Sequence, residues 1–118
     1  MGAHHLFTTK SHGDLSVAAG VGSLPQRQRA VSDHAAVPAV PWTWVNQVHG
    51  ADVVVARTPG DNAGAHADAV VTSEPGVPIA VQAADCALVA IEADGAVAVV
   101  HAGWKGLAAG VIGATLAT

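Results

Sequence analysis

The chain is poor in cysteine, in aromatic residues and in charge. Its 118 residues include one Cys, one Phe, no Tyr and three Trp, and only 12% are charged. A single Cys excludes an internal disulfide and fits a reducing cytoplasm. Five Lys and Arg stand against nine Asp and Glu, which gives a net charge of −4. This balance argues against nonspecific binding to nucleic acid or to an anionic membrane surface.

Long apolar runs and a leader segment are also missing. No stretch of about 18 apolar residues is uninterrupted by glycine or charge, so the sequence predicts no transmembrane span. The N-terminus lacks the basic and apolar regions of a signal peptide, and we therefore expect a cytoplasmic protein. Hydrophobic residues, mostly Ala and Val, make up 51% of the chain, which is enough for one modest domain.

Two apolar runs joined by Asp94-Gly95 organise the sequence. An Asp-Gly pair between β-prone runs predicts a hairpin whose two turn residues both have positive φ. In that register Leu88 opposes His101, and Cys86 becomes the diagonal neighbour of His101, with Cα atoms roughly 7–8 Å apart. Both faces of the two strands are apolar, so we expect a central strand pair that is covered on both sides.

The remaining segments predict short strands and two helices. Residues 42–49 alternate as a strand does, and Gly50 with Asp52 favours a turn from which residues 53–56 return. Further strands are expected over 5–9, 68–72 and 79–83, and helices over 24–36 and 107–118. The last helix would carry an apolar stripe of Leu107, Val111, Ile112 and Leu116.

The thiol and two histidines are candidates for a metal site. A lone Cys is often an inert core residue, and a lone His at a strand end is often a hydrogen-bonded core residue. The predicted closeness of Cys86 and His101 favours a pair of ligands or a Cys–His catalytic pair. His49 also ends an apolar strand. Two His and one Cys would leave the fourth position of a zinc ion open, as catalytic sites require.

Asp85 and Lys105 are the other polar residues beside these segments. Asp85 could act as a general base or orient a ligand His, and it could equally cap a turn. Lys105 lies where the last strand leads into the last helix, whose N–H groups would suit an anion. An ordinary strand-to-helix turn with a solvated Lys is the alternative.

Four segments occur in an order that is specific as a set: Asn46-Gln47-Val48-His49-Gly50, Ala67-Asp68-Ala69-Val70-Val71-Thr72, Ala84-Asp85-Cys86 and His101-Ala102-Gly103-Trp104-Lys105-Gly106. Together they resemble the YfiH family, also called the laccase-domain or multicopper polyphenol oxidase family. Gln28-Arg29 resembles the family's "NR" segment more loosely, with Gln in place of Asn. A Leu at position 88 replaces the family's usual Pro.

The resemblance implies an α/β layered fold: a mixed β-sheet with a central β-hairpin and flanking helices. It implies a metal site, usually taken as zinc, whose ligands match His49, Cys86 and His101. Family activities are the phosphorolysis and deamination of purine nucleosides, chiefly adenosine, and an older assignment is copper-dependent oxidation of phenols. The fold is also similar to that of toxin deamidases with a Cys–His pair.

A thiolate with two imidazoles suits Zn(II) and also Cu(I). We rank zinc above copper, because a multicopper oxidase needs many more His ligands than these. The catalytic residues would be Cys86, His101 and Asp85. The phosphate would be bound by Lys105 and, from the resemblance, by Arg29. A metal-free Cys–His hydrolase or deamidase and a non-catalytic half-domain remain as alternatives.

Family members continue well past the last predicted helix into a second half that this chain lacks. We therefore expect residues 1–118 to form one domain without the family's C-terminal half. Without that half, the chain would expose apolar surface of the hairpin. Because exposed apolar patches of this kind are usually covered by a partner, we expect self-association or pairing with a separate second half.

Overall fold

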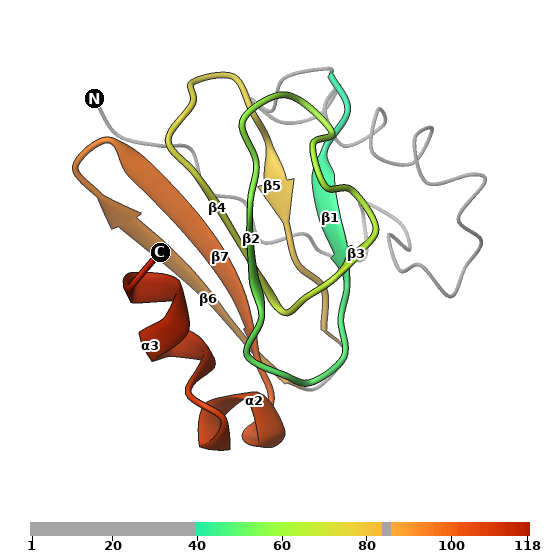
Figure 1. The fold of residues 1–118 in the computed structure, drawn as a ribbon, viewed down its shortest axis with the longest axis vertical. Helices are drawn as coiled ribbons and strands as arrows, with labels where there is room; N and C mark the ends of the chain where they lie inside the picture. The colour runs from blue at the N-terminus through green and yellow to red at the C-terminus, as the bar shows by residue number, and fades with distance from the viewer. Residues whose placement is uncertain (1–39, 84–85) are drawn as a thin grey trace, which may run out of the picture.

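The computed structural model describes residues 40–83 and 86–118. In that part of the chain the strands form two sheets (Figure 1). The smaller sheet has the order β3-β1-β5, and its strands Ala65–His66, Thr43–Asn46 and Ile79–Ala80 are parallel. The larger sheet has the order β2-β4-β7-β6, with strands Val53–Val55, Ala69–Thr72, Ala96–Ala102 and Ala87–Ala93. It is mixed, since β2 and β4 are parallel while β7 is antiparallel to both of its neighbours. The α/β class and the mixed sheet are as predicted.

Strands β6 and β7 form the predicted hairpin. Ala93 pairs with Ala96, and Leu88 pairs with His101, in an unbroken antiparallel register. The turn itself differs from the expectation. Gly95 has a φ of 73°, whereas Asp94 does not have a positive φ, so the turn is not type I′. The register is nevertheless the predicted one, because the two-residue length of the loop sets the pairing.

Among the described strands, β7 lies between β4 and β6, and β6 has β7 as its one neighbour. The prediction that both hairpin strands are central is met by β7 within this part of the chain. No residue of β6 is buried, whereas β7 buries Ala98, Val100, His101 and Ala102. An apolar sequence like that of β6 is also typical of buried strands, so it does not show how many strands will pair with β6. That number depends on pairing with distant parts of the chain.

Residues 53–56 do not return along the strand that precedes them, contrary to prediction. β1 is shorter than the predicted strand and pairs in parallel with β3 and β5, while β2 pairs with β4 in the other sheet. The connection between them crosses from one sheet to the other. Its backbone N–H groups at Val48, His49 and Gly50 donate to the side chain of Asp68 rather than to a neighbouring strand. The predicted strand over 68–72 is present as β4, and the one over 79–83 is limited to β5.

The larger sheet has a covered apolar face on each side. One buried cluster joins the two sheets and contains Val45, Ala56, Ala67 and Val70, with partly buried residues such as Ile79 around it. The other lies between the larger sheet and the C-terminal helix, and contains Ala69, Val100, Ala102 and Val111. Two covered faces explain why β4 and β7 are continuously apolar instead of alternating.

The single helix predicted over 107–118 is two helices, α2 (Trp104–Ala108) and α3 (Val111–Leu116). Gly110 separates them with a left-handed φ of 84°, a conformation that interrupts a helix and favours glycine. α3 packs on β7, β4 and β2 in front of the larger sheet (Figure 1). Of the predicted stripe Val111 is fully buried and Ile112 is half-buried, whereas Leu107 and Leu116 are exposed.

The strand predicted over 5–9 and the helix predicted over 24–36 lie outside the described residues. Among the helices that the structure describes, none is both long and apolar enough to cross a membrane.

Candidate metal centre

Three of the predicted site residues meet at the end of the larger sheet where β6 begins and β7 ends. His49 comes from the crossing segment after β1, Cys86 directly precedes β6, and His101 lies in β7. Each offers one ligand atom, and these atoms lie within 4.8 Å of one another. The rings of His49 and His101 meet edge to face, with centroids 5.1 Å apart. This is the only such cluster of potential ligands in the described part of the chain.

The donor set and the space around it fit a zinc ion. Zinc takes imidazole nitrogen at about 2.0 Å and thiolate sulfur at about 2.3 Å in tetrahedral geometry. The observed cluster needs only a modest contraction to reach that arrangement. Gly103 keeps the space open, because a Cβ there would lie 3.3 Å from the Cys86 sulfur and 3.3 Å from Cδ2 of His49. Three protein ligands would leave one position for substrate or water.

His49 has an unusual backbone conformation, with a φ of 60°. Histidine reaches this left-handed region only at some cost unless the surroundings hold it there. Here one carboxylate holds it: Oδ1 of Asp68 accepts the N–H groups of Val48 and Gly50 at 3.1 and 2.9 Å, and Oδ2 accepts that of His49 at 3.0 Å. The crossing segment is thus wrapped around the side chain of Asp68.

Asp68 also contacts the second imidazole. Its Oδ2 lies 2.7 Å from Nδ1 of His101, and both side chains are buried. Burial alone would raise the pKa of Asp68, but hydrogen bonds from His101 and from the backbone of Gly50, Val48 and His49 outweigh it and hold the pKa below its ordinary value. The carboxylate is therefore ionised at neutral pH, as an acceptor of four hydrogen bonds should be.

Asp68 lies in the motif of residues 67–72, and the motif alone does not predict its role. A charged residue flanked by Ala67 and Ala69, at the start of an apolar strand, was the available signal. Such a residue is fully buried only when it is paired, so its partners had to lie elsewhere in the chain.

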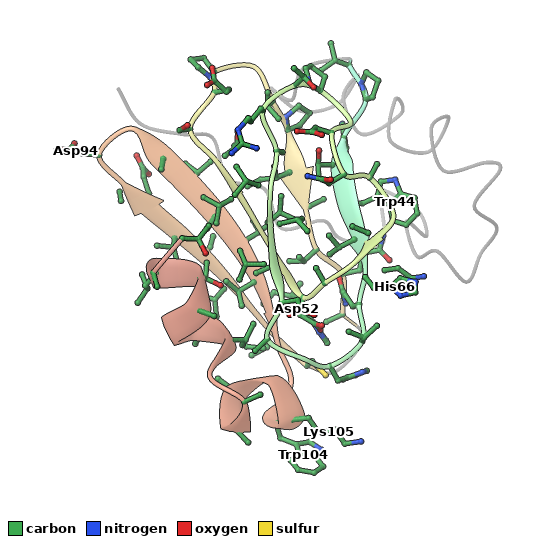
Figure 2. The ribbon with its side chains drawn as sticks, viewed as in Figure 1. Trp44, Asp52, His66, Asp94, Trp104 and Lys105 are labelled. Atoms are coloured by element: carbon green, nitrogen blue, oxygen red, sulfur yellow. The ribbon has the colours of Figure 1, made fainter. Side chains whose placement is uncertain are left out.

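Of the remaining predicted residues, Lys105 is the one that the structure describes, and it is not a member of this cluster. Lys105 is exposed on α2, with Nζ 5.6 Å from the ring centroid of the exposed Trp104. Figure 2 shows both side chains projecting from α2, at the end of the molecule opposite Asp94 in the hairpin turn. α2 has only five residues, so its N-terminus offers a weaker dipole than expected. Asp85 and Arg29 lie outside the described residues.

Comparison with known proteins places this geometry in a family. The model of the multi-copper polyphenol oxidoreductase laccase family matches residues 9–118, which include the whole His49, Cys86, His101 and Asp68 cluster. The chain belongs to this family. Among its relatives is a purine nucleoside phosphorylase of Streptomyces coelicolor, 40% identical over 129 residues that cover 98% of this chain and 53% of the relative. Another, the purine nucleoside phosphorylase YfiH of Shigella flexneri, is 44% identical over 82 residues, 68% of this chain and 33% of the relative.

Solved structures agree with the assignment to this laccase-domain family. YlmD of Geobacillus stearothermophilus has a TM-score of 0.72 at 28% identity, over 87% of this chain and 43% of that one. A Neisseria meningitidis protein has a TM-score of 0.70 at 32% identity, over 88% of this chain and 43% of that one. The chain spans about half the length of the curated relatives that it matches over most of its own residues.

Proposed function

We propose that this chain carries the metal centre of a zinc-dependent purine nucleoside enzyme. The reaction would be phosphorolysis of adenosine-type nucleosides, their deamination, or both. The observation that carries the proposal is the convergence of His49, Cys86 and His101 from three separate segments within 4.8 Å. The printed names of the relatives, purine nucleoside phosphorylases, supply the substrate class.

The residues of the chain divide the chemistry between them. His49, Cys86 and His101 would hold zinc, which supplies a Lewis acid and lowers the pKa of bound water. In phosphorolysis, phosphate replaces the base at the ribose C1′ atom and yields free base and ribose 1-phosphate. In deamination, water replaces the amino group of the purine and releases ammonia. Asp68 would keep the proton of His101 on Nδ1 in either reaction.

Lys105 is proposed to contribute positive charge toward the phosphate. It is exposed two residues after Gly103, whose missing side chain leaves room beside the Cys86 sulfur. Arg29, by its match to the family's "NR" segment, is the second proposed phosphate contact. Asp85, which directly precedes Cys86, is the proposed general base or orienting residue.

The test combines metal analysis with two product assays. Purified chain is expected to contain stoichiometric zinc, and to release free base and ribose 1-phosphate from adenosine only when phosphate is present. Ammonia release without phosphate would identify deamination. Cys86→Ala is the inactive control, and His66→Ala, at an exposed histidine of β3, is the matched variant that should retain activity. A chain that binds zinc but catalyses neither phosphorolysis nor deamination would support the non-catalytic half-domain instead.

One observation favours a second candidate, a metal-free hydrolase or deamidase. Cys86, His101 and Asp68 supply a thiol, an imidazole and a carboxylate that accepts from Nδ1, the chain of groups that activates nucleophiles in several enzyme families. In that case purified protein would contain no zinc, and Cys86 would react rapidly with iodoacetamide. Copper ranks lower, because the three donors of the described cluster suit a single ion and not several copper centres.

The extent of the functional unit is part of the proposal. Residues 1–118 would form one domain, and this domain would supply only part of the active site, since the relatives are about twice as long as the matched region. Further substrate contacts would come from the part that the relatives have beyond the matched region. A cytoplasmic location is proposed from the single Cys and is tested by fractionation.

A further inference from the structure

The geometry points to Asp68 as a positioning residue that sets up two of the three metal ligands at once. We infer that it fixes the tautomer of His101, so that Nε2 faces the centre without a proton, and that it holds the crossing segment that presents His49. The inference deepens the proposed function, because it concerns the same centre.

The first half of the inference follows from the hydrogen bond to His101. Both carboxylate oxygens of Asp68 already accept backbone N–H groups, so Nδ1 of His101 donates across the 2.7 Å contact. A neutral imidazole has one N–H, and Nε2 is then left with its lone pair exposed. That lone pair is what a metal requires, and it is equally what a thiol requires of its base.

The second half follows from the backbone contacts. Three successive N–H groups, from Val48 to Gly50, point at the same carboxylate. The unusual φ of His49 belongs to this wrapped segment. The backbone of Asp68 adds a further link, since its carbonyl oxygen accepts the N–H of His101 at 2.7 Å. The two histidines are therefore aligned through one buried residue rather than independently.

The substitution Asp68→Asn would test whether both carboxylate oxygens are needed as acceptors. An amide has one acceptor oxygen, but each carboxylate oxygen here accepts from two donors. Turning the NH₂ toward Val48 and Gly50 would oppose two backbone donors that cannot change. Turning the NH₂ toward His101 opposes only one backbone donor, the N–H of His49. The imidazole of His101 adds no opposition, because it can move its proton to Nε2 and accept through Nδ1. Asp68→Asn should therefore block the very nitrogen that faces the centre.

The test uses nitrogen-15 NMR of the histidine rings and titration with Co²⁺ as a spectroscopic substitute for zinc. In the neutral imidazole of metal-free wild-type His101, the proton should lie on Nδ1. In Asp68→Asn the proton should move to Nε2. The Co²⁺ affinity should fall by roughly 10–100-fold, as it does when an outer partner of a metal-bound His is lost.

A matched control separates positioning from stability. Thr72→Val removes the buried hydrogen bond from Thr72 Oγ1 to the carbonyl of Ala56. Thr72 is the last residue of β4, whereas Asp68 directly precedes the first residue of that strand. Thr72→Val should lower stability while leaving the His101 tautomer and the Co²⁺ affinity unchanged. Equal losses of affinity in both variants would overturn the inference.

The wild-type tautomer decides the matter even if Asp68→Asn does not fold. Wild-type His101 with its proton on Nε2 would overturn the inference whatever the metal content. Wild-type chain that binds no Co²⁺ but carries the Nδ1 proton would support the role of Asp68 and would overturn only the metal part of the proposed function.

Discussion

Asp68 and His101 face each other across β4 and β7, and their side chains meet at 2.7 Å although 33 positions separate them in the sequence. The pairing of β4 with β7 brings them together, since Ala69 pairs with Val100 and the next step along the ladder joins Asp68 to His101. The turn of the β6–β7 hairpin is remote from this point, but its register aligns Leu88 with His101 and so brings Cys86 beside the imidazole. Two independent strand pairings therefore build one centre.

Cys86→Ala should abolish stoichiometric zinc binding while the fold persists. The thiol is only half-buried, so its loss should change the free energy of unfolding by less than about 1 kcal/mol. Elemental analysis and urea unfolding are the two measurements. A destabilised protein with no zinc in either form would instead identify Cys86 as a core residue.

Gly103→Ala should weaken zinc binding without straining the backbone. The φ of Gly103 is −73° and its ψ is 168°, which alanine adopts readily, so the effect is steric. The new Cβ would press on the Cys86 sulfur and on His49, both at 3.3 Å. We expect an affinity loss of about tenfold, at the low end of what disturbed support of metal ligands costs. Competition with a chromogenic zinc chelator measures it, and an unchanged affinity would show that the centre lies elsewhere.

Gly106→Ala should destabilise the fold by about 1–3 kcal/mol. A Cβ at this buried position of α2 would lie 2.9 Å from the backbone oxygen of Gly50, and neither backbone can yield easily. Gly113→Ala is the matched control, because Gly113 lies in α3 with nothing within 4 Å of its new Cβ. It should raise stability by up to about 1 kcal/mol through helix propensity. Urea unfolding of both variants checks the difference, and similar losses in both would argue against close packing of α2 on the crossing segment.

Local sequence patterns predicted the hairpin and the meeting of Cys86 with His101, because a two-residue turn sets the register of everything that follows. They did not predict that β6 has a single neighbour among the described strands, or that β1 and β2 belong to different sheets. Those outcomes depend on which distant strands pair, and apolar runs such as residues 53–55 carry no record of their partner. The role of Asp68 was hidden for the same reason: its four donors come from segments 18 to 33 positions away. Gly110 lies inside the predicted helix 107–118, and its left-handed φ in the structure shows that one helix ends there before the next begins.

Among the described strands β6 lies at the edge of the larger sheet, and this position gives the predicted self-association a specific place. Seven residues of this strand pair with β7 on one side, and no described strand lies on the other. The strand has no proline, no lysine and no bulge, and Glu92 is its only charged residue, so it lacks most of the devices that keep edge strands apart. Its residues Leu88, Val89 and Ile91 are only half-buried.

Ala90→Lys should therefore shift the chain toward the monomer. Ala90 is exposed in the middle of β6, where a lysine would oppose edge-to-edge pairing. Ala108→Lys adds the same charge at an exposed position of α2 and should leave association unchanged. Sedimentation velocity at micromolar concentration should show the wild-type chain and Ala108→Lys as dimers or larger species, and Ala90→Lys predominantly as a monomer. A wild-type chain that sediments as a monomer at every concentration would refute self-association through β6.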